Sequence, residues 1–87
     1  MSMKLLITID TECDNGWART GKVTTENARH LPRFQQFCAK FAFKPTYLVA
    51  YEMALDRFFI DFAKDALKRS TCEIGSHPHP WNTPPCL

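Results

Sequence analysis

The sequence predicts an α/β fold in which parallel strands alternate with helices. Three short apolar runs, at residues 4–9, 46–50 and 71–75, have the length and residue types of buried strands. The two segments between them repeat apolar residues every three or four positions, as amphipathic helices do. The order strand, helix, strand, helix, strand implies right-handed crossovers and a parallel sheet.

The first strand is expected over residues 4–9, with Asp10 just past its carboxyl end. Its leucine and isoleucine run suits a strand covered on both faces. Residues 11–24 contain Asn15-Gly16 and scattered polar groups, which indicates a loop longer than a strand-to-helix turn needs. A loop of that length at a strand end is often functional.

The first helix contains Pro32 near its start, where the missing N–H of proline costs nothing. Whether residues 25–30 form an earlier turn of it stays open. Asp56 is the expected N-cap of the second helix, and lysine and arginine gather near the end of that helix. Six phenylalanines follow helical spacing and are predicted to face the core: Phe34, Phe37, Phe41, Phe58, Phe59 and Phe62.

Composition limits the functions that the chain can have. Its 87 residues make one domain at most, and 45% hydrophobic with 23% charged residues is ordinary for a globular protein. A net charge of +2 from scattered residues gives no reason to expect a nucleic-acid or membrane partner. The first apolar run is too short for an export signal, so a cytoplasmic location is expected. The four cysteines lack C-x-x-C spacing and are expected to be mostly free thiols.

Two histidines, His77 and His79, follow the third strand, and a proline follows each of them. Proline favours extended backbone in the residue before it. In a flat strand the two imidazoles would point to one face, whereas in a polyproline helix they would diverge. A proline-rich surface loop without a metal is the alternative.

Three acids, Asp10, Glu12 and Asp14, follow the first strand at intervals of two. A metal-dependent hydrolase needs one carboxylate as a ligand and a second to take a proton from water. Carboxyl ends of parallel strands share one rim of the sheet, and ends that are one strand apart are roughly 10 Å from each other. The acids and the histidines can therefore belong to one metal site, although a solvated acidic loop remains the alternative.

Thr8-Ile9-Asp10-Thr11-Glu12 and Glu73-Ile74-Gly75-Ser76-His77 resemble the first two motifs of the polysaccharide deacetylase family, the NodB-homology domain. The resemblance implies a distorted (β/α) barrel, a divalent metal that is usually zinc, and hydrolysis of N-acetyl or O-acetyl groups on carbohydrate. It also implies that Asp10 is the catalytic base and that Glu12, His77 and His79 are the metal ligands. The chain departs from the usual motifs in having Thr11 after Asp10 and histidines two rather than four apart, a form similar to a divergent branch of the family.

Residues 1–87 are expected to be the amino-terminal portion of one such domain. A complete barrel of about 250 residues has eight units, so 87 residues supply about three. The family's later motifs, which carry its arginine and its general-acid histidine, are absent from the sequence, and His30 precedes the first helix and is not expected to reach the site. We therefore expect the chain alone to be nearly inactive and to leave a sheet edge exposed, which an oligomer would cover.

Other functions remain open at this stage. The chain could be a truncated, non-catalytic fragment or binding module, or it could belong to a cyclic amide hydrolase of the same fold, since the Asp-x-Glu form also occurs in such enzymes. Trp81, beside the histidines, could offer an apolar face to a sugar ring or could simply pack, and the same holds more weakly for Trp17.

Overall fold

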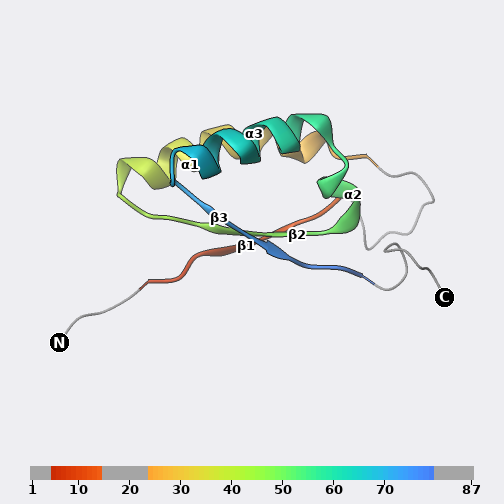
Figure 1. The fold of residues 1–87 in the computed structure, drawn as a ribbon, viewed down its shortest axis with the longest axis horizontal. Coiled ribbons are helices and arrows are strands. Elements are labelled where there is room, and N and C mark those ends of the chain that lie inside the picture. The colour runs from red at the N-terminus through yellow and green to blue at the C-terminus, as the bar shows by residue number, and fades with distance from the viewer. Residues whose placement is uncertain (1–4, 15–23, 80–87) are drawn as a thin grey trace.

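A computed structural model describes residues 5–14 and 24–79 of the chain. Within these residues the protein is a parallel sheet with helices on one of its faces (Figure 1). None of the described helices is long and apolar enough to cross a membrane. In chain order the elements are β1 (Thr8–Thr11), the 3-10 helix η2 (Glu26–His30), α1 (Leu31–Lys40), β2 (Thr46–Val49), α2 (Tyr51–Ala54), α3 (Arg57–Lys68) and β3 (Glu73–Ser76).

The sheet has the order β1-β2-β3, and both pairs of strands are parallel. Thr11, Val49 and Ser76 are aligned across the three carboxyl ends. The hydrogen bonding continues one residue further, because Ala50 N donates to the carbonyl of Thr11 and His77 N donates to the carbonyl of Val49, both at 2.9 Å. The predicted parallel α/β arrangement is therefore confirmed, and β2 separates the two strands that carry the candidate site residues.

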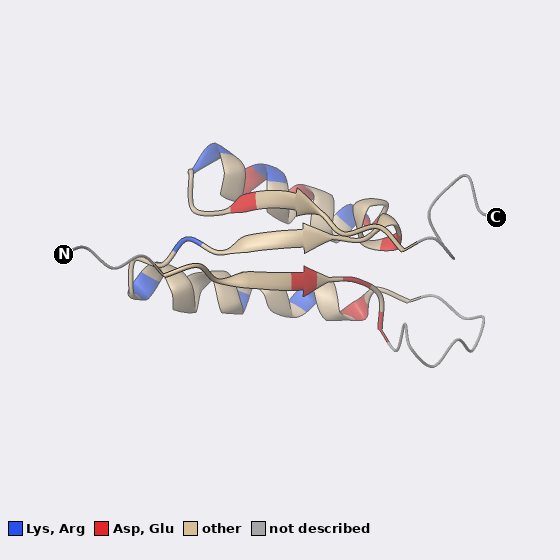
Figure 2. Ribbon diagram, turned by 90° about the horizontal axis from the view of Figure 1, so that it is seen from below, with Lys and Arg blue, Asp and Glu red and all other residues tan. Residues whose placement is uncertain are grey.

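The helices α1 and α3 lie on the same side of the sheet, and Figure 2 looks onto the opposite face with the three strands in front. Tyr47 of β2 is fully buried beneath these helices. Its ring meets Phe34 of α1 and Phe62 of α3 edge to face, at centroid distances of 6.5 Å and 5.6 Å. Its hydroxyl donates to Gln35 Oε1 at 2.8 Å, and the Gln35 amide donates to the Thr71 carbonyl at 2.9 Å. A satisfied polar chain thus crosses the apolar core.

A second apolar cluster fixes the end of the molecule where the strands finish. Met53 of α2 packs with Ala28 of η2 and with Phe59 and Ala63 of α3. This packing holds the four-residue helix α2 and the start of α3 over the carboxyl end of β2, next to the candidate site.

Two aspartates fix the chain around this cluster. Asp56 caps α3 as predicted, since its Oδ1 accepts the Phe59 N–H at 2.7 Å. Asp14 accepts three hydrogen bonds, from the hydroxyl of Thr24 at 2.9 Å and from the N–H groups of Glu26 and Asn27 at 2.8 and 3.1 Å. Asp14 therefore ties the segment after β1 to the start of η2.

The first strand differs from its prediction. It begins at Thr8 and includes Asp10, whereas Leu5 and Leu6 precede it and are exposed. The partner strand β2 begins only at Thr46, opposite Thr8, and its first N–H donates to the Ile7 carbonyl at 2.8 Å, so the pairing with β2 does not reach Leu5 and Leu6. Within the described residues only one face of the strand is covered by helices, not both (Figure 1).

The first helix also differs in which residues it buries. Phe37 and Phe41 were predicted to be core, but they are 58% and 52% exposed and contact each other at a centroid distance of 5.1 Å. Gln35 and Cys38 occupy the buried positions instead. Because Gln35 turns inward to meet the hydroxyl of Tyr47, the buried face of α1 is rotated away from the two phenylalanines.

Several smaller predictions can be compared directly. The second strand ends at Val49, one residue before its predicted bound, the second predicted helix is α3 and begins directly after its predicted N-cap Asp56, and the third strand is shifted to Glu73–Ser76. The open question about residues 25–30 is answered by η2. Cys13, Cys38 and Cys72 are free thiols as predicted, while Cys86 lies outside the described residues.

Candidate metal centre

The candidate metal centre lies at the carboxyl ends of β1 and β3. Successive side chains of a strand alternate between its faces, so Asp10 and Glu12 project on the same side. Glu12 follows β1 by one residue and His77 follows β3 directly. The continued register aligns Glu12 with Ala50 and His77, so a small side chain at position 50 stands between the two.

Glu12, His77 and His79 converge at this rim. Glu12 Oε2 lies 2.6 Å from His79 Nε2 and 3.6 Å from His77 Nε2. The two imidazoles meet edge to face, with centroids 4.9 Å apart. One ligand atom from each residue lies within 4.8 Å of the others, and all three side chains are half-buried. The three residues, called the Glu-His-His cluster below, could therefore hold a metal ion.

The His77-Pro78-His79 segment follows β3 and directs both imidazoles to the same side, as an extended backbone does and a polyproline helix does not. Both imidazoles reach the same carboxylate oxygen of Glu12, which requires residues i and i+2 to project to one side. The two prolines that follow the histidines in the sequence favour this extended backbone.

Two of the distances within the cluster are close to those around a small divalent ion such as zinc, whereas the widest separation, up to 4.8 Å, must close to hold one. With zinc bonds of about 2.0 to 2.1 Å, donor atoms in a tetrahedral site lie about 3.3 Å apart. The 3.6 Å between Glu12 and His77 is close to this value, and the 2.6 Å between Glu12 and His79 must widen by less than about 1 Å. Two imidazoles, one carboxylate and an open fourth position form a typical donor set of catalytic zinc.

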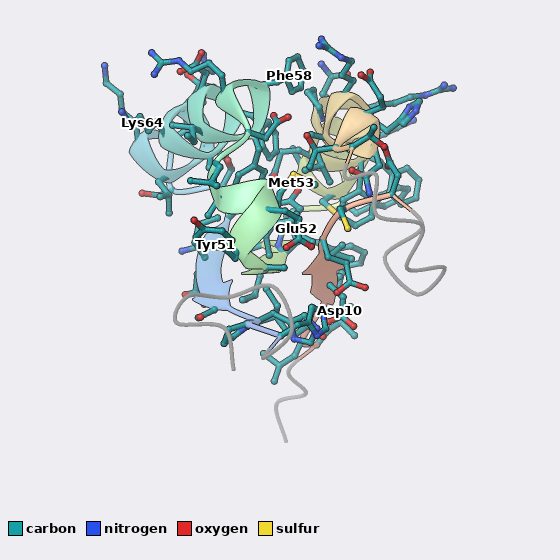
Figure 3. All side chains as sticks on the ribbon, turned by 90° about the vertical axis from the view of Figure 1, so that its right-hand side faces the viewer. Asp10, Tyr51, Glu52, Met53, Phe58 and Lys64 are labelled. Atoms are coloured by element: carbon teal, nitrogen blue, oxygen red, sulfur yellow. The ribbon has the colours of Figure 1, made fainter. Side chains whose placement is uncertain are left out.

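Asp10, predicted as the catalytic base, lies inside β1 and not past its end. Its side chain is exposed and belongs to the same face of the sheet as Glu12, but it is not one of the three clustered residues. Figure 3 views the molecule from the carboxyl ends of the strands and labels Asp10 on β1.

The remaining predicted candidates lie apart from the cluster or cannot be placed. Asp14 is engaged by the start of η2 and therefore has a structural role. His30 is exposed at the end of η2. Trp17 and Trp81 lie outside the described residues.

Glu52 is a residue next to this site that the sequence reading did not identify. It belongs to α2, and its Oε1 accepts the N–H of Cys13 at 3.1 Å. Burial alone would raise the pKa of Glu52, but hydrogen bonds from Cys13 and the nearby imidazole of His79 outweigh burial and hold it below its ordinary value. Burial and the Glu52 carboxylate together raise the pKa of the Cys13 thiol to about 11. The sequence feature that could have identified Glu52 is its position two residues after the second predicted strand, on the rim where the other site residues lie.

Comparison with known proteins finds no matching family model, and no curated protein or solved structure with significant similarity to the chain.

Proposed function

We propose that the chain is part of a metal-dependent hydrolase of the polysaccharide deacetylase type, which removes acyl groups from N-acetylated or O-acetylated carbohydrate. The observation that carries the proposal is the Glu-His-His cluster, in which residues 12 and 77 to 79 come together at one rim. The same residues carry the sequence resemblance, so motif and geometry support one assignment.

The topology supports a partial barrel as the parent architecture. Strands in the order β1-β2-β3 with helices on one face are the repeating arrangement of a (β/α) barrel, whereas doubly wound sheets carry helices on both faces. Active sites of such barrels lie at the carboxyl ends of the strands. The Glu-His-His cluster occupies the corresponding end here.

In this proposal Glu12, His77 and His79 hold the metal. A zinc ion, when bound, supplies Lewis acidity that polarises an acyl carbonyl and makes water more acidic. The Asp10 carboxylate, exposed on the same face, accepts the proton of the attacking water. Protonation of the leaving amine needs a general acid, and the proposal assigns that role to none of the described residues.

One observation favours a non-catalytic binding module as the second candidate. The 2.6 Å contact between Glu12 and His79 is a complete hydrogen bond without any ion. If the cluster is only a structural ion pair, the chain needs no metal and catalyses nothing.

Metal analysis of the tag-free chain tests the proposal. After metal-free purification, zinc, cobalt or manganese is added, excess is removed, and retained metal is counted per chain. The wild type should retain about one equivalent, and His77→Ala with His79→Ala should retain essentially none. His30→Ala is the matched control, because it removes an exposed imidazole outside the cluster. Equal retention by the double variant and the wild type would rule the metal site out.

Substrate assays then separate the hydrolase reactions. Acetate release from N-acetylated sugars supports the deacetylase, whereas ring opening of cyclic amides supports the cyclic amide hydrolase alternative. Either activity, even if weak, should be lost in Asp10→Asn, since the amide cannot accept the proton.

A further inference from the structure

Glu52 lies where the elements around the candidate metal centre meet. The short helix α2 starts at the carboxyl end of β2, and Figure 3 shows it between β3 and β1, with Glu52 labelled on it. Packing of the neighbouring Met53 into the cluster of Ala28, Phe59 and Ala63 fixes this helix. The Glu52 carboxylate therefore projects from a firmly held element toward the rim.

One hydrogen bond and one electrostatic interaction connect Glu52 with the segments that carry the metal ligands. Through Cys13 N, 3.1 Å from its Oε1, it holds the residue that directly follows Glu12. The charge of the His79 imidazole also contributes to lowering the pKa of Glu52. Glu12 follows the first strand and His79 follows the third, and Glu52 belongs to the short helix α2 that follows the strand between them, so it lies between the two halves of the cluster.

We propose that Glu52 is a positioning residue of the metal centre, which holds the Glu12 segment through the Cys13 amide and orients the His79 imidazole by its charge. This inference rests on the proposed metal-dependent function. Ligating histidines are commonly oriented by a second carboxylate, and loss of such a partner typically weakens metal binding about 10- to 100-fold.

Two substitutions separate the two contributions. Glu52→Gln keeps an oxygen that can accept the Cys13 N–H but removes the negative charge, whereas Glu52→Ala removes both. Glu73→Gln is the matched control, because Glu73 is an exposed acid at the amino end of β3, paired there with Lys44 at 4.0 Å. Glu73→Gln changes the net charge by the same amount as Glu52→Gln. Glu73 lies at the end of β3 that is opposite to the candidate metal centre.

The experiment measures zinc affinity by competition with a chromogenic chelator, and the visible spectrum of the cobalt-substituted chain. Glu52→Gln should weaken zinc binding about tenfold and shift the cobalt bands, and Glu52→Ala should weaken it further, toward 100-fold. Glu73→Gln should match the wild type in both measurements. Unfolding temperatures show whether Glu52→Gln remains folded, so that lost affinity is not mistaken for lost structure.

The results distinguish this inference from the function on which it rests. If the wild type binds zinc but both Glu52 variants bind it equally well with unchanged cobalt spectra, the positioning role is wrong and the metal centre stands. If the wild type and the double histidine variant both fail to bind metal, the proposed function fails and this inference fails with it.

Discussion

Asp56 is the residue whose removal should most clearly destabilise the end of the molecule that carries the site. Its Oδ1 accepts the Phe59 N–H at the start of α3, and its Oδ2 accepts the hydroxyl of Thr25 just before η2. One carboxylate thus holds both α3 and the chain that leads into η2. Asp56→Ala removes both hydrogen bonds at once.

The size of the effect follows from these contacts. Loss of an N-cap costs about 0.5 to 2 kcal/mol, and loss of the charged hydrogen bond to the Thr25 hydroxyl adds about 1 kcal/mol after allowance for partial exposure. We expect the free energy of unfolding to fall by about 1.5 to 3 kcal/mol. For a domain of this size that corresponds to a fall in Tm of about 6 to 24 °C.

Urea and thermal unfolding followed by circular dichroism measure this change. Asp61→Ala is the control, since Asp61 forms only an exposed ion pair with Arg57 and should cost less than about 0.5 kcal/mol. Asp56→Asn retains an acceptor for the Phe59 N–H and should fall between the two. If Asp56→Ala were no more destabilised than Asp61→Ala, the reasoning from the cap would be refuted.

The pH dependence gives an independent check. Hydrogen bonds from the Thr25 hydroxyl and the Phe59 N–H lower the pKa of Asp56 in the folded state. The unfolded chain therefore binds this proton more readily, so the stabilisation is complete above the unfolded pKa of about 3.9 and is lost as pH falls through the lower folded pKa. The difference in stability between wild type and Asp56→Asn should accordingly shrink below about pH 4.

Three further predictions concern the core, a thiol and the metal. Tyr47→Phe leaves the buried Gln35 carbonyl without its donor and should cost about 1 to 3 kcal/mol in urea unfolding, whereas the exposed Tyr51→Phe should stay within about 0.5 kcal/mol of wild type. Cys13, with its raised pKa of about 11, should react with iodoacetamide at pH 8 roughly tenfold more slowly than an ordinary thiol, and Glu52→Gln should speed this reaction in site-resolved mass spectrometry; an unchanged rate would contradict the contact. Zinc at about 100 times its Kd should raise the free energy of unfolding by about 2.7 kcal/mol, reversibly with EDTA, and an unchanged Tm would count against the metal centre.

The sequence was sufficient to predict the order of strands and helices and the rim where the cluster forms. These features depend on patterns that are local or that follow from chain direction, such as the helical period of α3 and the cap at Asp56. Parallel strands put Glu12 and His77 on one rim whatever the length of chain between them.

Features that depend on a spatial neighbour were missed. The start of β1 depends on where β2 begins, and the exposure of Phe37 depends on the inward turn of Gln35. The helix α2 is too short to show a period, so Glu52 was not recognised as part of the site. The direction of the two imidazoles likewise required knowing that the segment around Pro78 is extended.

The placement of the cluster on the two outer strands of the sheet has a consequence for folding. Glu12 and His79 are 67 positions apart in the chain, and the central strand must join both outer strands before their side chains can meet. A partly folded chain therefore cannot offer all three donor atoms to one ion. An ion bound by Glu12, His77 and His79 would therefore be present only in molecules in which β3 has joined the sheet. Such an ion would also slow the detachment of β3.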